Sequence, residues 1–347
     1  MFLTYLTDIM RGKRRGPADS LVSAVLRAAS IPYAAGVGMV DLAYRLGIRK
    51  IDRPPMPVVS VGNLTLGGTG KTPMVVLVAE HFRMSGRKPA ILTRGYGNDE
   101  CRMFADEAPF VPVYRGQNRL KSAEKAFADG RDVAVLDDGF QHRKIARDLD
   151  LLLLDGIQLL GRGLMFPAGV MREPSSAAMR SDMVVLTKTD SLGKERIAEA
   201  LAFAGRIAPG KPIVLARHVP VSFTDSSGRS LELGTLRQKD VCVVSGIVDP
   251  DYFERTIRDI GATVRKRFFY PDHHQYTKKD MDSIERECSG DGITTIVTTA
   301  KDFVKMRDLD VPGTLAKVLV LKVKMEITEG KESFFAGLDS VFGHTGR

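Results

Sequence analysis

The sequence predicts an α/β fold with a parallel sheet, a second and smaller α/β lobe, and a helical N-terminal segment. From Pro57 onward, short apolar runs alternate with longer stretches whose apolar residues recur at helical spacing, which is typical of βαβ units. A glycine-rich loop directly follows the first apolar run. The 347 residues are enough for two domains, each with its own core.

Residues 1–50 are expected to form a basic and apolar helical segment that associates with a membrane. Arg11, Lys13, Arg14 and Arg15 form a basic cluster, and an apolar stretch follows from Leu21 to Leu46. Arg27, Asp41 and Arg45 interrupt that stretch, and Pro32 is expected to kink it, so it does not read as a regular transmembrane helix. An interfacial helix on anionic lipid and a helical hairpin packed on the protein itself fit the residues equally well.

Residues 51–225 are expected to form the nucleotide-binding core. The strands that we predict there are Val58–Val61, Ala90–Thr93, Val111–Tyr114, Val133–Leu136, Leu149–Leu154, Met183–Leu186 and Ile213–Ala216. The stretches Pro73–Gly86 and Leu120–Ala128 are predicted to be crossover helices.

Residues 226–347 are expected to form a second α/β lobe that closes over a cleft, with the boundary between Pro220 and Asp240. The predicted strands are Val241–Ser245, Val264–Tyr270, Thr295–Thr298 and Val318–Val323, with helices near Tyr252–Ile260 and Lys278–Cys288. In open parallel sheets, ligands bind at the carboxyl ends of the strands, so we expect the site there.

The net charge indicates what kind of partner the protein binds, and the cysteine content indicates the redox state of its cellular compartment. The net charge of +9 indicates an anionic partner, which could be nucleic acid, a phosphate compound or an acidic membrane surface. Three widely spaced cysteines, Cys101, Cys242 and Cys288, fit neither a disulfide framework nor a zinc site, in agreement with a reducing cytosol.

The loop after the first strand is predicted to bind a nucleoside triphosphate. It differs from the pattern G-x-x-x-x-G-K-[ST] only in having a threonine at the first glycine position, and it consists of Thr65, Leu66, Gly67, Gly68, Thr69, Gly70, Lys71 and Thr72. Glycine lets backbone N–H groups turn toward phosphate oxygens, and the helix that follows adds its positive end. Lys71 is expected to reach the β- and γ-phosphates, and the Thr72 hydroxyl is expected to contact Mg²⁺.

Two adjacent carboxylates mark a predicted metal site. Asp137 and Asp138 follow the apolar run from Val133 to Leu136. In P-loop enzymes an acidic residue at this place holds Mg²⁺ between the phosphates. The alternative is a pair of solvated loop aspartates, and the sequence leaves open which of the two carboxylates touches the metal.

Seven segments occur in an order that resembles the tetraacyldisaccharide 4′-kinase family: SVGNLTLGGTGKTP, LTRGYG, VLDDGFQHR, PAGVMREP, VSGIVDP, FFYPDHH and TTAKDFVKM. The resemblance covers nearly the whole chain, from about Pro32 to Val323. It implies a kinase that uses Mg²⁺ and ATP to phosphorylate the 4′-hydroxyl of a lipid A disaccharide 1-phosphate precursor, giving lipid IVA. It also implies a location at the cytoplasmic face of the bacterial inner membrane, with the N-terminal helix on the anionic surface.

The resemblance also assigns roles to individual residues. The residues that match positions lining the family's substrate and phosphate site are Arg119, Gln141, His142, Arg172 and Glu173. The catalytic residues would be Lys71, Asp99 as the general base and His273 as its partner from the second lobe. The family's base lies in Gly-Asp-Glu-Pro, whereas this chain has Asn98-Asp99-Glu100-Cys101, so two of the four letters differ.

Two other classes of protein were weighed against this resemblance. A P-loop GTPase or ATPase switch is suggested by Thr187-Lys188-Thr189-Asp190, which is similar to the guanine-reading element [NT]-K-x-D. A nucleic-acid-binding protein is suggested by charge alone, but no known motif is present and the basic residues are scattered apart from Arg11–Arg15. We therefore expect no nucleic acid partner, and the oligomeric state stays open.

Overall fold

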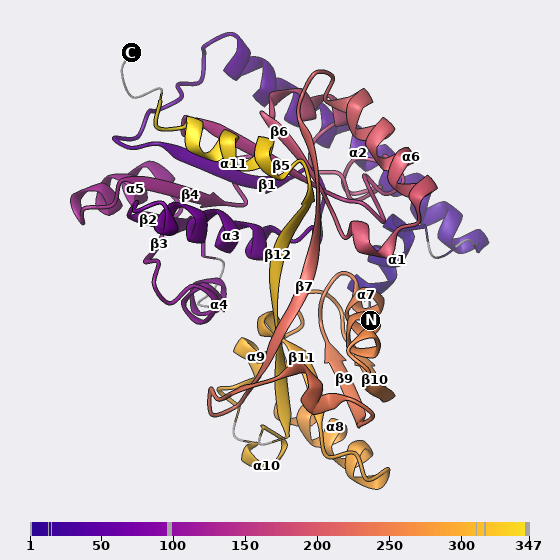
Figure 1. Cartoon of the computed structure of the whole chain (residues 1–347). Coiled ribbons are helices and arrows are strands. Elements are labelled where there is room, and N and C mark those ends of the chain that lie inside the picture. The colour runs from indigo at the N-terminus through magenta and orange to yellow at the C-terminus, as the bar shows by residue number, and fades with distance from the viewer. Residues whose placement is uncertain are drawn as a thin grey trace. The chain divides into compact units, whose positions relative to one another are not determined.

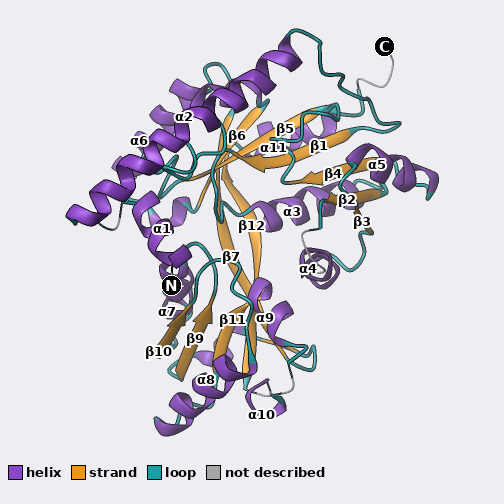
Figure 2. Ribbon diagram, turned by 180° about the vertical axis from the view of Figure 1, so that it is seen from behind, coloured by secondary structure: helices purple, strands orange, loops and turns teal. Residues whose placement is uncertain are grey.

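The chain folds into two compact units (Figures 1 and 2). In this computed structural model, residues 2–12, 14, 16–95, 99–309, 311–315 and 317–343 are described. The first unit comprises Met1–Arg94, Ala108–Arg217 and Met325–Arg347, and the second comprises Gly95–Glu107 and His218–Lys324. The chain therefore passes from one unit to the other more than once.

The first unit contains a parallel sheet in the order β7-β6-β5-β1-β4-β2-β3. Its strands are β1 (Val58–Asn63), β2 (Pro89–Thr93), β3 (Val113–Arg115), β4 (Val133–Asp137), β5 (Leu149–Asp155), β6 (Met183–Thr187) and the start of β7 (Ile213–Asp225). Every residue of β1, β2, β4, β5 and β6 is buried, as is typical of parallel strands that are covered on both faces. All seven strands predicted for this part of the chain are present.

After its first strand, the first unit also contains helices and short 3-10 turns. They are α3 (Lys71–Met84), α5 (Arg119–Ala128), α6 (Lys194–Ile207), α11 (Lys331–Ser340), η1 (Ser175–Arg180) and η2 (Thr189–Ser191). Both predicted crossover helices are confirmed, as α3 and α5. Buried side chains of β5, β6 and α6 pack into one hydrophobic cluster, and those of β2, β4 and α5 pack into another.

Two helices precede the sheet: α1 (Phe2–Met10) and the 29-residue α2 (Pro17–Arg45). Pro32, where a kink is expected, lies inside α2, and the helix continues on both sides of it. None of its residues, all of which the structure describes, is buried. Its polar groups nevertheless contact the core, because the Tyr33 hydroxyl donates to the Arg172 carbonyl at 3.0 Å and Asp41 pairs with Arg143.

The second unit has parallel strands in the order β10-β9-β11-β12. Its elements are α4 (Asp99–Glu107), β8 (Ser230–Leu231), η3 (Leu233–Leu236), β9 (Asp240–Ser245), α7 (Pro250–Asp259), β10 (Thr263–Phe269), α8 (Lys278–Gly290), β11 (Ile296–Thr299), α9 (Ala300–Met306), α10 (Pro312–Leu315) and most of β12 (Val318–Glu329). The helices and strands predicted for this region are all present.

The compact units differ from the expected division in three segments, of which the shortest is residues 218–225, expected in the core but part of the second unit. Residues 95–107, which we placed in the core, belong to the second unit, where α4 pairs with the residues that directly follow α9: Arg102 with Asp308, and Asp106 with Arg307 at 2.9 Å. Residues 325–347, which we placed in the second lobe, belong to the first unit. There His81 on α3 contacts Asp339 on α11 at 2.8 Å.

Candidate active site

The loop between β1 and α3 has the backbone of a phosphate-binding loop. Gly67 and Gly70 adopt positive φ angles of 132° and 83°, and Gly70 is the N-cap of α3. This conformation favours glycine, and it leaves N–H groups at the start of α3 available for an anion. Thr65 can replace the first glycine because it is 6% exposed and pairs with Met171 in a short antiparallel bridge. The neighbouring Leu66 N–H donates to the Val170 carbonyl at 2.6 Å.

Lys71, the first residue of α3, points toward the ends of two strands. Its Nζ lies 3.2 Å from Oδ1 of Asn63 at the end of β1 and 3.3 Å from Oδ1 of Asp138, which follows β4. Strands β1 and β4 are adjacent and parallel, so their carboxyl ends bring these two residues to one edge of the sheet. The structure thus brings together Lys71 and Asp138 as the sequence predicted.

The Asp138 carboxylate also forms an ion pair with Arg172, which belongs to the PAGVMREP segment. Arg172 Nη1 lies 2.8 Å from Oδ2 and 3.0 Å from Oδ1 of Asp138, and it contacts Oε1 of Gln141 at 3.2 Å. Burial alone would raise the pKa of the Asp138 carboxyl, but Lys71 and Arg172 outweigh it and hold that pKa below its usual value. Asp138 is therefore an anion that holds two cations in place.

Asp137, the last residue of β4, makes its contacts with residues outside this ion-pair cluster. Its Oδ2 accepts from the Thr93 hydroxyl at 3.5 Å, and its backbone carbonyl accepts from Arg119 at 3.5 Å. Arg119 begins α5 and is only 3% exposed. Carboxylates of this kind and the Thr72 hydroxyl are oxygen donors that Mg²⁺ accepts, usually together with substrate phosphates.

No group of three or more His, Cys, Asp or Glu side chains able to hold a metal occurs among the described residues. A Mg²⁺ ion held by one or two carboxylates and by nucleotide phosphates does not need such a group. The donor set at Thr72, Asp137 and Asp138 therefore fits magnesium bound together with a nucleotide.

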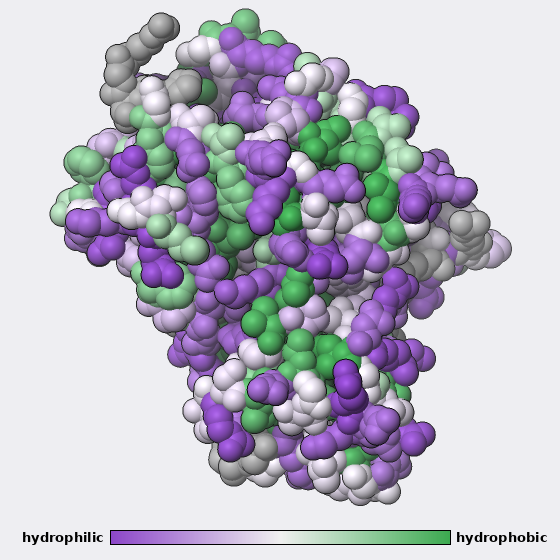
Figure 3. All heavy atoms as spheres, in the orientation of Figure 1, coloured by the Kyte–Doolittle hydropathy of each residue, from purple (hydrophilic) through white to green (hydrophobic). Residues whose placement is uncertain are grey.

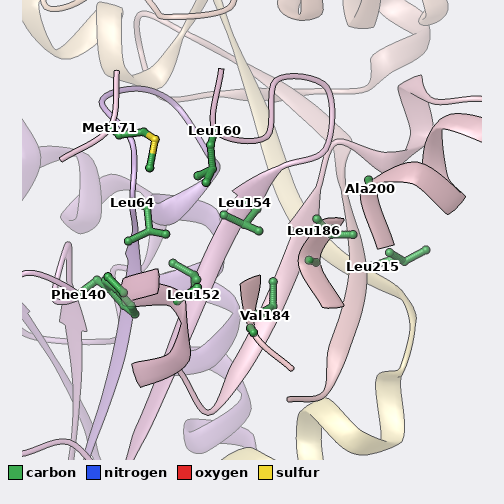
Figure 4. Packing of buried hydrophobic residues seen from close by; sticks show 14 residues of the cluster. Leu64, Phe140, Leu152, Leu154, Leu160, Met171, Val184, Leu186, Ala200 and Leu215 are labelled. Atoms are coloured by element: carbon green, nitrogen blue, oxygen red, sulfur yellow. The ribbon is translucent and has the colours of Figure 1, made fainter. Parts of the chain in front are cut away.

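Two glycines allow the DDGFQHR turn to pass close to β1. A Cβ built on Gly62 would lie 2.6 Å from the Phe140 backbone nitrogen, and one built on Gly139 would lie 2.5 Å from Ser60 Oγ. Below the turn, Leu64, Phe140 and Met171 pack in the same buried cluster as Leu152 of β5 (Figure 4). The three segments that carry the site therefore share one core.

Three other predicted residues lie beside this turn. His142 is half-buried, and burial together with nearby Arg119, Arg147, Arg94 and Lys144 lowers its pKa to about 4. Gln141 donates from Nε2 to the Asn63 carbonyl at 2.8 Å. Glu173 pairs with Arg180 at 2.7 Å, so its carboxylate is held by the protein itself.

The two remaining catalytic candidates belong to the second unit. Asp99 is the first residue of α4, and its side chain lies outside what the structure describes. His273 has a left-handed backbone with φ of 62°, and its Nε2 lies 3.6 Å from Asp272, which in turn pairs with Lys301 at 2.6 Å. Asp99 and His273 thus share a unit that does not contain the phosphate loop.

Sequence reasoning missed Asn63 and Tyr33 at the site, and it named Thr187 only for the similarity of its segment to a guanine-reading element. The Asn63 side chain accepts a hydrogen bond from Lys71, and its backbone carbonyl accepts one from Gln141. The Tyr33 hydroxyl donates to the Arg172 carbonyl. The Thr187 hydroxyl donates to the Thr69 carbonyl of the loop at 3.0 Å. Asn63 and Thr187 are the last residues of β1 and β6. The feature of the sequence that could have identified these two residues is a polar residue at the end of a buried strand.

Comparison with known proteins gives one family. A sequence profile for tetraacyldisaccharide-1-phosphate 4′-kinase matches residues 22–100 and 98–342. The tetraacyldisaccharide 4′-kinase of Anaeromyxobacter dehalogenans strain 2CP-C is 36% identical over 350 residues, covering 94% of this chain and 92% of that protein. The enzyme of the same name from Syntrophus aciditrophicus is 32% identical, covering 87% of this chain and 89% of that protein.

A solved structure is also similar over most of the chain. LpxK from Aquifex aeolicus, crystallised in complex with ATP, is 26% identical and superposes with a TM-score of 0.73. The match covers 92% of this chain and 99% of that one.

Proposed function

The chain belongs to the tetraacyldisaccharide 4′-kinase family, and we propose that it transfers the γ-phosphoryl group of ATP to the 4′-hydroxyl of a tetraacyldisaccharide 1-phosphate. The product is lipid IVA, an intermediate of lipid A biosynthesis. The observation that carries the residue assignment is the cluster of Lys71, Asp138 and Arg172 beside the loop that begins α3.

Phosphoryl transfer needs positioning and charge stabilisation more than covalent chemistry. The N–H groups at the start of α3 hold the β-phosphate, and Lys71 and Arg172 face the γ-phosphate, where negative charge develops. Asp138 keeps both cations on the same side of the loop before the nucleotide arrives. Gln141 and His142, which is neutral at physiological pH, are placed to contact the sugar acceptor as hydrogen-bonding groups.

Thr72, Asp137 and Asp138 would hold Mg²⁺ with the β- and γ-phosphates. The ion neutralises charge on the phosphate oxygens when it is bound. Arg119 donates hydrogen bonds to the Asp137 carbonyl and to the Gly116 carbonyl. These bonds would hold the end of β4, and with it Asp137, in position.

Asp99, paired with His273, is proposed to accept the proton of the 4′-hydroxyl. The support is the position of Asp99 within the Asn98-Asp99-Glu100-Cys101 segment and the location of both residues in one compact unit. In this scheme the Asp99 carboxylate takes the proton, and His273 orients the carboxylate.

The enzyme is proposed to work at the cytoplasmic face of the inner membrane with α2 in the interface. By length and composition α2 is apolar enough to cross a membrane. However, one face is held to the first unit by Tyr33 and Asp41, while Leu21, Ile31 and Met39 are between 66% and 70% exposed. A helix with one protein-bound face and one exposed apolar face fits an orientation parallel to the surface.

The proposal is tested by transfer of radiolabelled γ-phosphate from ATP to a lipid A disaccharide 1-phosphate in detergent. We expect labelled lipid with the wild type and a loss of at least about a thousandfold with Lys71→Ala, since its charge acts on the transferred group. Lys125→Ala, an exposed lysine on α5, serves as the matched control and should retain activity. Absence of labelled lipid with the wild type would overturn the assignment.

The base assignment has its own test. Asp99→Ala should lower kcat by roughly a hundredfold or more at saturating substrates, with less effect on KM, because general-base catalysis contributes about 10²–10⁴-fold. His273→Ala should give a smaller loss that is not additive with that of Asp99→Ala. An Asp99→Ala enzyme with wild-type kcat would remove Asp99 from the mechanism.

A further inference from the structure

We propose that Thr187-Lys188-Thr189-Asp190, at the end of β6, forms a base-recognition segment that lets the donor site take GTP as well as ATP. The inference rests on the proposed function, because the nucleotide concerned is the phosphoryl donor. It assigns to Asp190 the recognition of the base, and to Thr187 and Lys188 the positioning of that residue.

The first step is that the segment is joined to the phosphate loop. The Thr187 hydroxyl contacts the Thr69 carbonyl of the loop at 3.0 Å and the Leu154 carbonyl of β5 at 3.3 Å. Strands β1, β5 and β6 are parallel neighbours, so their carboxyl ends lie at one edge of the sheet. The residues after β6 therefore lie on the same edge as a nucleotide bound to the loop.

The second step concerns the direction in which a bound nucleotide runs. Lys71 pairs with Asp138 on the β4 side of β1, where we expect the γ-phosphate, whereas Thr69 connects the loop to β6 on the opposite side of β1. A triphosphate whose γ end lies toward β4 directs its nucleoside end toward β5 and β6. The base then reaches the segment that begins at Thr187.

The third step is that the segment is rigid. Lys188 has a left-handed backbone with φ of 57°, and its Nζ pairs with Oδ2 of Asp155 at 2.6 Å. Both side chains are less than 10% exposed, and Oδ1 of Asp155 accepts from the Ile157 N–H at 2.9 Å. The Thr189 hydroxyl donates to the Ala216 carbonyl of β7 at 3.1 Å. A buried ion pair that holds a strained turn is typical of a functional site rather than of stability.

The fourth step is the chemistry of Asp190. The residue is exposed, although the two residues before it are buried, so the turn presents its carboxylate at the surface. The Watson–Crick edge of guanine carries two neighbouring donors, N1–H and the 2-amino group, which match the two oxygens of a carboxylate. The same edge of adenine offers one donor and one acceptor, so a carboxylate can make one hydrogen bond to it.

The test compares nucleotides on the full-length protein, first by equilibrium binding without lipid and then in the transfer assay. For the wild type we expect GTP to bind at least as tightly as ATP and to support transfer. With Asp190→Asn we expect GTP binding to weaken by at least tenfold and ATP binding to change by less than about threefold. XTP should gain affinity, because xanthine carries a carbonyl where guanine has the 2-amino group and an amide can donate to it.

Glu199→Gln is the matched control, because Glu199 is a surface carboxylate on α6 that is 65% exposed. It should leave all three affinities unchanged. Wild-type GTP binding more than tenfold weaker than ATP binding, or equal losses for GTP and ATP in Asp190→Asn, would overturn the inference. If the protein discriminates the bases as described but transfers phosphate from neither nucleotide, the proposed function is wrong. The base-recognition segment would still be supported in that case.

Discussion

Asp138 is the residue on which the arrangement of the site depends. It has a positive φ of 50°, and its carboxylate pairs with both Lys71 and Arg172. A triphosphate would compete with this carboxylate for the two cations, whereas in the proposed site the carboxylate would serve as a ligand of the metal. The same side chain thus opposes metal-free binding and supports metal-dependent transfer.

This dual role predicts opposite effects for Asp138→Asn. In EDTA, binding of the triphosphate should tighten by roughly threefold to tenfold, because the two cations lose their carboxylate partner. With Mg²⁺, transfer should fall by at least about a hundredfold, since metal and charge placement are both lost. Calorimetric titration with and without Mg²⁺ measures the first effect, and weaker binding in EDTA would contradict the competition argument.

His142 predicts a pH dependence of stability. Its folded pKa of about 4 lies below the usual value of 6.5, so between these values the unfolded chain binds a proton that the folded protein does not. His142 therefore destabilises the fold as the pH falls from 6.5 toward 4. We expect His142→Gln to raise Tm relative to the wild type more at pH 5 than at pH 8. Equal Tm differences at the two pH values would show that His142 titrates normally in the folded protein.

At the residue scale, the sequence predicted the site where the chemistry depends on residue type within a short segment. The glycines and Lys71 of the loop, and Asp138 after β4, could be placed because a strand, a loop and a helix follow one another directly. Arg172 was identified only through the family resemblance, since its contact with Asp138 spans 34 residues. The contact between Thr187 and Thr69 spans 118 residues and could not be read from local pattern.

At the scale of the elements, β1 and the turn after β4 depend on a close approach at Gly62. Gly62→Ala would place a methyl group against the Phe140 backbone, which cannot move without shifting Asp138. We expect a loss of about 1–3 kcal/mol of stability, as for other overpacked cores, and a larger relative loss of nucleotide affinity. Denaturant unfolding and nucleotide titration measure the two effects. Gly36→Ala in α2 is the control, because nothing lies within 4 Å of the added carbon, and it should be neutral or stabilising.

The strands could be predicted from the sequence where all of their residues are buried. Five fully buried strands were found because continuous apolar runs bounded by turns are a strong local signal. The 13-residue β7 was predicted only over its first four residues, because nearly all of its later residues are half-buried or exposed and several carry polar side chains. The ion pairs of α4 in the second unit are made with Arg307 and Asp308, just after α9 and about 200 residues away, which no local pattern reports.

At the scale of the whole molecule, the basic charge and the exposed face of α2 point to the same partner. Leu21, Val25, Met39 and Leu42 lie on one side of the helix by their spacing at about 100° per residue, and each is more than 50% exposed. In the orientation of Figure 1, α6 lies in front of α2, and hydrophobic residues are visible at the surface there among hydrophilic ones (Figure 3). The net charge of +9 adds attraction to anionic lipid that salt screens. We expect burial of the apolar side chains of α2 in the lipid to hold the protein on the membrane. We expect the net positive charge to increase the rate at which the protein binds to the anionic surface.

These two contributions can be separated by vesicle binding. Each large apolar side chain moved from water into hydrocarbon contributes about 1.5–3 kcal/mol, so Leu21→Glu with Val25→Glu should weaken binding to anionic vesicles by at least about tenfold. The same double change should leave phosphorylation of detergent-dispersed substrate within about twofold, because neither residue contacts the site. Met84→Glu and Val221→Glu make the same chemical change at exposed apolar positions outside α2 and should bind vesicles like the wild type. If the α2 variant floats with vesicles as well as the wild type does, the exposed stripe is not what anchors the enzyme. If binding survives in neutral vesicles at high salt, the basic charge contributes little to holding it there.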